Sequence, residues 1–133
     1  NNVAKQAVKD ACNAYKNFFA ALEYRLKQNR VIAIYPEAHI WPYYTKIRPF
    51  DEKSFRYPVD FDKPVFSFTN TYQKRKFSKK PKMVTYVDGP FFPDASVPKK
   101  ARQLKLRNEV YDAMTKRSQA NNIEVIKYLK EEL

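Results

Sequence analysis

The chain has 133 residues, 44% of them apolar and 16% aromatic, a composition typical of a globular domain with its own core. The 26 Lys and Arg exceed the 14 Asp and Glu, and the formal net charge of +12 predicts an anionic partner: nucleic acid, acidic lipid or a phosphorylated small molecule. A single Cys, His and Gly exclude, within these residues, a disulfide framework, a multi-histidine metal site and a Gly-rich phosphate loop.

No apolar run is long enough to span a bilayer, and no signal-peptide pattern opens the chain. The sequence begins without Met, inside a stretch that already has helical periodicity. We therefore expect a fragment or a processed form of a longer protein.

The first third of the chain predicts a helix followed by a strand. Apolar residues recur at spacings of three and four from Ala4 to Leu26, which predicts an amphipathic helix over 3–29 that packs on a sheet. Residues 31–35, Val-Ile-Ala-Ile-Tyr, are mostly β-branched or aromatic and stop at Pro36, so we expect a buried strand there. This tight helix-to-strand order favours an α/β layer architecture.

The middle of the chain alternates loops and strands. Residues 36–62 are rich in prolines and aromatic residues and predict a long, ordered loop. Strands are expected over 64–70 and 82–88, with a basic stretch between them, and the second strand should end at Gly89-Pro90.

The last part of the chain predicts helices. Pro98 is suited to a helix start, and the apolar spacing carries a helix to about Ser118. Asn121-Asn122 should break it, and a short final helical segment should cover 123–129. Residues 1–133 are thus expected to form a single α/β domain.

Several blocks of this sequence, in order, resemble the glycerolphosphate and lysophosphatidate acyltransferase superfamily. Tyr35-Pro36-Glu37 is similar to the start of its F-P-E-G-T-R block, and the later blocks correspond to Lys46-Ile47-Arg48-Pro49-Phe50, Ser54-Phe55, Lys63-Pro64-Val65-Phe66 and Val87-Asp88-Gly89-Pro90. The resemblance covers most of residues 3–118. It implies a mixed or mostly parallel sheet flanked by helices, here a truncated domain that carries the acceptor side of the site.

Two departures from the family pattern concern catalysis. The catalytic H-x-x-x-x-D block is absent, because Tyr44 stands where His39 would need an Asp, and the upstream block ending in Arg is also missing. In the F-P-E-G-T-R block, Ile40 replaces the arginine that helps relatives hold the acceptor phosphate. The 133 residues alone are therefore expected to be inactive.

The resemblance implies what the full-length protein does. It would transfer an acyl group from acyl-CoA or acyl-carrier protein to the hydroxyl of a lysophospholipid or glycerol 3-phosphate, in phospholipid synthesis. No cofactor beyond the acyl donor and no metal is expected, and the enzyme would lie in the cytoplasm, peripheral at the inner face of a membrane.

The substrate-binding residues expected from this comparison are Glu37, His39, Lys46 and Arg48. Glu37 and His39 would follow the strand at 31–35, at the edge where open α/β sheets bind ligands. A protonated His39 offers two N–H groups to a phosphate, or it is a structural residue of the aromatic loop. Arg48, with its bidentate fork, is the candidate to replace the missing arginine, and the alternative is a solvated surface charge.

Six cations fall within residues 74–82 and surround Phe77. They are Lys74, Arg75, Lys76, Lys79, Lys80 and Lys82. Three interpretations stay open: contact with an anionic membrane surface, contact with the phosphates of the acyl donor, or a solvated loop.

A small basic nucleic-acid-binding domain is the alternative function, because basic residues contact phosphates and aromatic residues stack on bases. The ordered blocks favour the acyltransferase, so no nucleic-acid partner is expected. An unpaired edge at the strand over 31–35 would promote self-association, so a homo-oligomer through this sheet edge is a further expectation.

Overall fold

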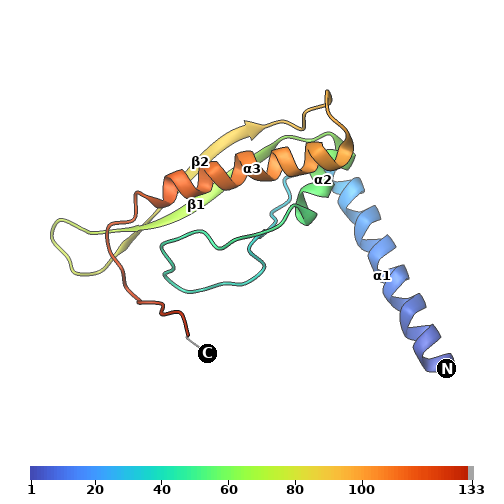
Figure 1. The fold of residues 1–133 in the computed structure, drawn as a ribbon, viewed down its shortest axis with the longest axis horizontal. Coiled ribbons are helices and arrows are strands. Elements are labelled where there is room, and N and C mark those ends of the chain that lie inside the picture. Colours follow the sequence, from blue (N-terminus) through green and yellow to red (C-terminus); the bar gives the residue numbers. More distant parts are fainter. Residues whose placement is uncertain (132–133) are drawn as a thin grey trace. The chain divides into compact units, whose positions relative to one another are not determined.

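A computed structural model describes residues 1–131, which belong to two compact units, Asn1–Ile34 and Tyr35–Leu133. The described residues contain three α-helices, one short 3-10 helix and a two-stranded sheet, in the order α1, η1, α2, β1, β2, α3 (Figure 1). The expectation of a single domain stays a prediction.

The first unit is a helix, α1 (Asn2–Lys27), followed by a short irregular segment. The Asn1 side chain caps it by accepting a hydrogen bond from the Val3 amide at 2.9 Å, and Arg25 and Lys27 lie in the last turn, where cations complement the helix dipole. The helix predicted over 3–29 is confirmed. Among its side chains only Leu22 is buried, and its packing on a sheet stays a prediction.

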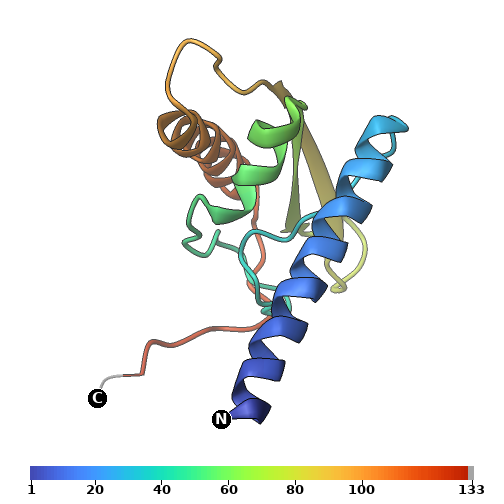
Figure 2. The same ribbon diagram turned by 90° about the vertical axis from the view of Figure 1, so that its right-hand side faces the viewer.

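The second unit is built on an antiparallel hairpin of β1 (Val65–Gln73) and β2 (Lys82–Phe91). Helix α3 (Lys99–Ser118) packs on one face of this hairpin, as Figure 2 shows with the helix seen end-on. Both strands and the helix after Pro98 are confirmed. The expected mixed or mostly parallel sheet is not observed among the described residues, since the two strands are consecutive and joined by a short loop.

β2 does not end at Gly89-Pro90 as predicted but continues to Phe91 through an irregularity in the pairing. Val65 pairs with Phe91 and Ser67 with Asp88, so one residue of β1 faces two of β2. Gly89 is required there, because its φ is +119° and a Cβ would lie 2.8 Å from the Val65 carbonyl oxygen.

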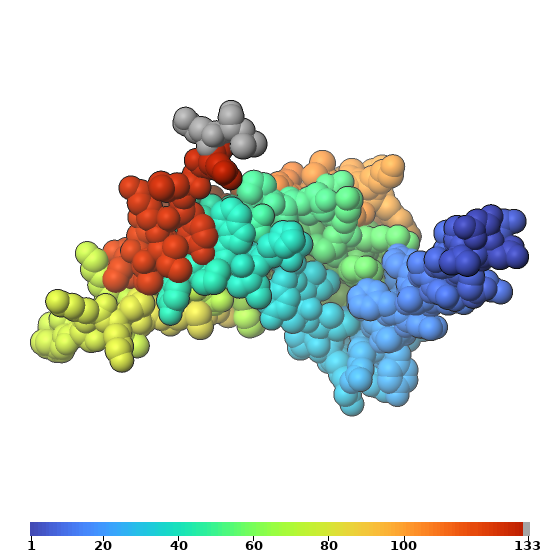
Figure 3. Space-filling view, turned by 90° about the horizontal axis from the view of Figure 1, so that it is seen from below, coloured from blue at the N-terminus to red at the C-terminus, as the bar shows by residue number. Residues whose placement is uncertain are grey.

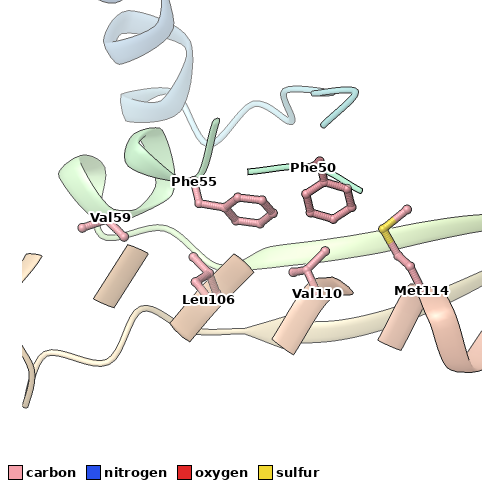
Figure 4. Close-up of a cluster of buried hydrophobic side chains, with 6 residues drawn as sticks. All are labelled: Phe50, Phe55, Val59, Leu106, Val110 and Met114. Atoms are coloured by element: carbon pink, nitrogen blue, oxygen red, sulfur yellow. The ribbon is translucent and has the colours of Figure 1, made fainter. Parts of the chain in front are cut away.

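The core of this unit lies between α3 and the segment that precedes β1. It consists of six buried side chains, drawn in Figure 4: Phe50, Phe55, Val59, Leu106, Val110 and Met114. The first three come from the region predicted as a loop, which contains η1 (Lys53–Phe55) and α2 (Arg56–Phe61). The spacing of Phe55 and Val59 places both on one helical face, which explains why this turn forms.

The strand predicted over 31–35 is wrong, because these residues have no regular secondary structure. Val31 is 97% exposed and Tyr35 is 79% exposed. β-Propensity reflects packing against neighbouring strands, and this segment pairs with none in the described part of the chain. The sheet edge expected at 31–35, and the self-association argued from it, lose their structural basis.

The short helix predicted over 123–129 is also wrong, since this stretch is irregular. Seven residues make a marginal helix unless packing supports it. Here the segment instead makes side-chain contacts with the loop around Pro42, described below.

Candidate functional site

The candidate site lies in the loop of residues 35–49, which is held together by Glu37 and Arg48. One carboxylate oxygen of Glu37 accepts a hydrogen bond from the backbone N–H of Arg48 at 2.7 Å, across eleven residues. Both residues are half-buried. Glu37, which is expected to bind substrate, thus has a hydrogen-bond partner within the protein.

Arg48 lies with its guanidinium over the ring of Trp41, at 4.2 Å from the ring centroid. This cation–π contact fixes the plane of the guanidinium group. The Nη1 atom of Arg48 is buried and has no hydrogen-bond partner among residues 1–131. Buried polar atoms nearly always have a hydrogen-bond partner, so Nη1 is a hydrogen-bond donor that is available to an acceptor from outside these residues.

Trp41 belongs to an aromatic cluster that joins the loop to the C-terminal segment. Its ring stacks on Tyr128 at 5.2 Å between centroids and meets Tyr44 edge-on at 5.1 Å. The Tyr128 hydroxyl donates to the Pro42 carbonyl at 2.7 Å. The space-filling view shows the C-terminal segment lying against this loop (Figure 3).

Asn121 connects three parts of the second unit. Its Oδ1 accepts from the Tyr72 amide in β1 at 2.6 Å, and its Nδ2 donates to the carbonyls of Thr45 at 3.0 Å and Ser118 at 2.7 Å. Asn122 extends this contact, because its amide donates to the Tyr72 carbonyl at 3.1 Å and its side chain accepts from the Lys74 amide at 2.7 Å. The two asparagines thus tie the candidate loop to the sheet.

The other two predicted site residues, His39 and Lys46, are exposed. The His39 amide donates to the Glu37 carbonyl at 2.8 Å, which closes a tight turn. Neither side chain makes a hydrogen bond or ion pair with another residue in the described part of the chain. The structure therefore brings Glu37 and Arg48 together and leaves His39 and Lys46 at the surface of the same loop.

The basic stretch 74–82 comprises the loop that connects β1 and β2 and the first residue of β2, Lys82, and all its residues except Pro81 are exposed. Its six cations form no ion pair within residues 1–131. Phe77 is 92% exposed, with the Lys76 ammonium 5.4 Å from its ring centroid. The predicted position of this basic stretch, between the two strands, is confirmed.

A second charged cluster lies where β2 faces α3. Arg117 donates a bidentate pair of hydrogen bonds to Asp88 and lies 4.8 Å from the Tyr86 ring centroid. The hydrogen bond from Arg117 holds the pKa of the Asp88 carboxyl below its ordinary value. An open hollow of about 490 Å³ adjoins this pair and also touches Lys116. The Arg117 fork is already engaged by Asp88, whereas Nη1 of Arg48 has no hydrogen-bond partner within residues 1–131.

No group of three or more His, Cys, Asp or Glu that could hold a metal ion is found in residues 1–131. In the same range, no helix combines the length and apolarity needed to cross a bilayer.

Comparisons with known proteins add no relative. No family model matches the chain, and no curated protein or solved structure matches it.

Sequence reasoning missed the residues that organise this site. The sequence indicates Asn121 only as a helix breaker, although an Asn pair directly after a helix is able to satisfy free backbone groups nearby. Tyr128 belongs to the helix predicted over 123–129, and nothing in the sequence indicates its stacking on Trp41. Contacts that join positions more than 80 residues apart leave no local pattern.

Proposed function

We propose that this chain is the acceptor-side portion of an acyltransferase of the glycerolphosphate and lysophosphatidate superfamily. In the full-length protein the reaction is acyl transfer from acyl-CoA or acyl-carrier protein to the hydroxyl of a lysophospholipid or glycerol 3-phosphate. The part played by residues 35–49 is to bind the phosphate of the acceptor.

The observation that carries this proposal is the unsatisfied Arg48 nitrogen. Glu37 fixes the Arg48 backbone, Trp41 fixes the plane of the guanidinium, and Nη1 is left buried without an acceptor. A phosphate oxygen would satisfy this donor, and guanidinium matches phosphate with two parallel hydrogen bonds. Exposed Lys46 and His39 on the same loop would add positive charge at its rim.

The order of the sequence blocks supports the family assignment, and the antiparallel hairpin does not add to it. The reaction needs a base to deprotonate the acceptor hydroxyl for attack on the thioester carbonyl, which then expels the thiolate. The single His39 has no orienting carboxylate at the family spacing, so the base is expected from an H-x-x-x-x-D block outside these residues. Residues 35–49 would orient the acceptor.

Binding of the acceptor tests the site directly. Calorimetric titration of the 133-residue chain with glycerol 3-phosphate should give saturable binding, and Arg48→Gln should weaken it at least tenfold, because a charge-assisted hydrogen bond contributes about 1.5–3 kcal/mol. Lys9→Gln, which removes an exposed charge in α1, is the control and should bind like the parent. Equal affinity of the Arg48 and Lys9 variants would remove Arg48 from the site.

Activity tests the family assignment. The 133 residues should not turn over acyl-CoA with lysophosphatidate, whereas a chain extended upstream to include an H-x-x-x-x-D block should. In that longer chain Glu37→Ala should lower activity strongly, and Glu37→Gln should retain more of it because the amide oxygen still accepts from the Arg48 amide. Robust turnover by the short chain would mean that a different catalytic group is present.

A further inference from the structure

The loop between β1 and β2 differs from the rest of the molecule in its charge. From residue 63 to residue 87 the sequence contains seven Lys or Arg and not one Asp or Glu. Elsewhere several cations are paired with acids, as Lys105 is with Asp94 and Arg117 with Asp88. The six cations of residues 74–82 have no such partner within the described chain.

The position of this loop makes it accessible. It protrudes beyond the C-terminal end of α3, as Figures 1 and 3 show from two directions. β1 and β2 are paired up to Gln73 and Lys82, so the loop is displayed at the end of an ordered hairpin. Lys74 is further fixed through its amide by Asn122.

Two apolar side chains accompany these cations. Phe77 is 92% exposed at the loop and Met83 is 62% exposed at the start of β2. A fully exposed phenylalanine amid lysines is costly to hydrate and gains free energy on entering an apolar phase. The combination of cations around a projecting aromatic residue is typical of segments that lie at a membrane interface.

We propose that the β1–β2 hairpin loop docks the protein on an anionic lipid surface, with Phe77 inserted below the headgroups and the surrounding Lys and Arg on lipid phosphates and carboxylates. This proposal goes beyond the acyl-transfer function and stands on the hairpin alone. Lipid is favoured over single-stranded nucleic acid because the loop offers one isolated aromatic residue. Proteins that bind single-stranded nucleic acid use several aromatic residues, on which successive bases stack.

Vesicle sedimentation tests the electrostatic part. The parent chain should bind vesicles of phosphatidylcholine with 30% phosphatidylserine at low salt, and should bind pure phosphatidylcholine far more weakly. The triple variant Lys76→Gln, Lys79→Gln, Lys80→Gln should bind the anionic vesicles roughly 100-fold more weakly, since each near-surface cation contributes roughly fivefold. The matched control replaces Lys5, Lys9 and Lys16 of α1 by Gln and should bind like the parent. An equal loss in both triple variants, or strong binding to neutral vesicles, would overturn the proposal.

Insertion is tested with a tryptophan at the loop. In a Trp41→Phe background, Phe77→Trp places the sole tryptophan at position 77, and its emission should shift to the blue and be quenched by brominated lipids in anionic vesicles. Vesicle binding without quenching would refute insertion. A thymidine oligonucleotide and CoA serve as competitors in separate experiments. Full displacement of the parent from vesicles by a micromolar concentration of the oligonucleotide would assign the loop to nucleic acid, and full displacement by CoA would assign it to the acyl donor. All variants lie at exposed positions, and the circular dichroism spectrum of each should match that of the parent chain.

Discussion

Asn121 is the residue whose removal should most clearly separate the candidate loop from the sheet. Replacement by Ala deletes the acceptor of the Tyr72 amide and the donor to the carbonyls of Thr45 and Ser118. The Tyr72 amide lies at a half-buried strand position and the Thr45 carbonyl in a half-buried part of the loop. Both groups would be left without their present partner.

The magnitude follows from counting these hydrogen bonds. Each contributes about 1 kcal/mol net, and a partly buried group left unpaired adds to the cost, so Asn121→Ala should lower the free energy of unfolding by about 2–3 kcal/mol. For a unit of this size, that corresponds to a fall in Tm of roughly 10–20 °C. Asn122→Ala is the matched control, because it loses one side-chain bond, to the exposed Lys74 amide, and keeps its backbone bond to Tyr72. We expect it to cost about 0.5–1 kcal/mol.

Urea unfolding followed by far-ultraviolet circular dichroism measures both variants, with the midpoint compared at equal slope. The same pair of variants should be titrated with glycerol 3-phosphate, because Asn121 also holds the Thr45 carbonyl in the loop that carries Arg48. The reasoning is refuted if Asn121→Ala unfolds at the same urea concentration as Asn122→Ala.

Three further outcomes follow from the second unit. Leu106→Ala should lower the free energy of unfolding by about 2–5 kcal/mol, because the Leu106 side chain is only 1% exposed. The control Leu104→Ala, at a residue that is 47% exposed, should change the free energy of unfolding by less than about 1 kcal/mol, and thermal unfolding compares the two variants. Asp88→Asn should lower Tm at neutral pH, and the difference in Tm from the parent should shrink as pH falls below about 4. The reason is that the hydrogen bond from Arg117 lowers the pKa of Asp88 in the folded state, and this stabilisation is lost when the carboxylate is protonated. A difference in Tm that stays constant with pH would contradict this. Tyr128→Ala should shift the emission of the single tryptophan to the red, and an unchanged spectrum would exclude the stacking.

The elements that could be predicted from the sequence are those with a sustained local pattern. α1 and α3 have apolar residues at helical spacing over many turns. In β1 and β2, which lie on either side of a turn-forming stretch, apolar and polar residues alternate over much of each strand. The segment at 31–35 has the composition of a strand but pairs with no other strand in the described chain. Composition alone therefore cannot decide whether such a run pairs.

The candidate site was predictable in part for the same reason. Glu37 and Arg48 are both expected to be site residues. The hydrogen bond between them joins the Tyr35-Pro36-Glu37 block to the block that contains Arg48, two of the blocks on which the family resemblance depends. The role of Glu37 as the partner of a backbone amide was not foreseen, because an exposed carboxylate and a bonded one have the same sequence signature. The stacking of Tyr128 on Trp41 depends on where the irregular C-terminal segment passes, which no periodicity reports.

The charge of the β1–β2 hairpin has a consequence for how its contacts respond to conditions. From residue 63 to residue 87 there is no carboxylate and no imidazole, the side-chain types that change protonation between mildly acidic and neutral pH. Acidification of the surroundings over that range therefore adds no positive charge to residues 63–87, the part of the hairpin that precedes Asp88. On the proposed docking, the attraction of these residues to an anionic surface would depend on ionic strength and on the charge density of that surface.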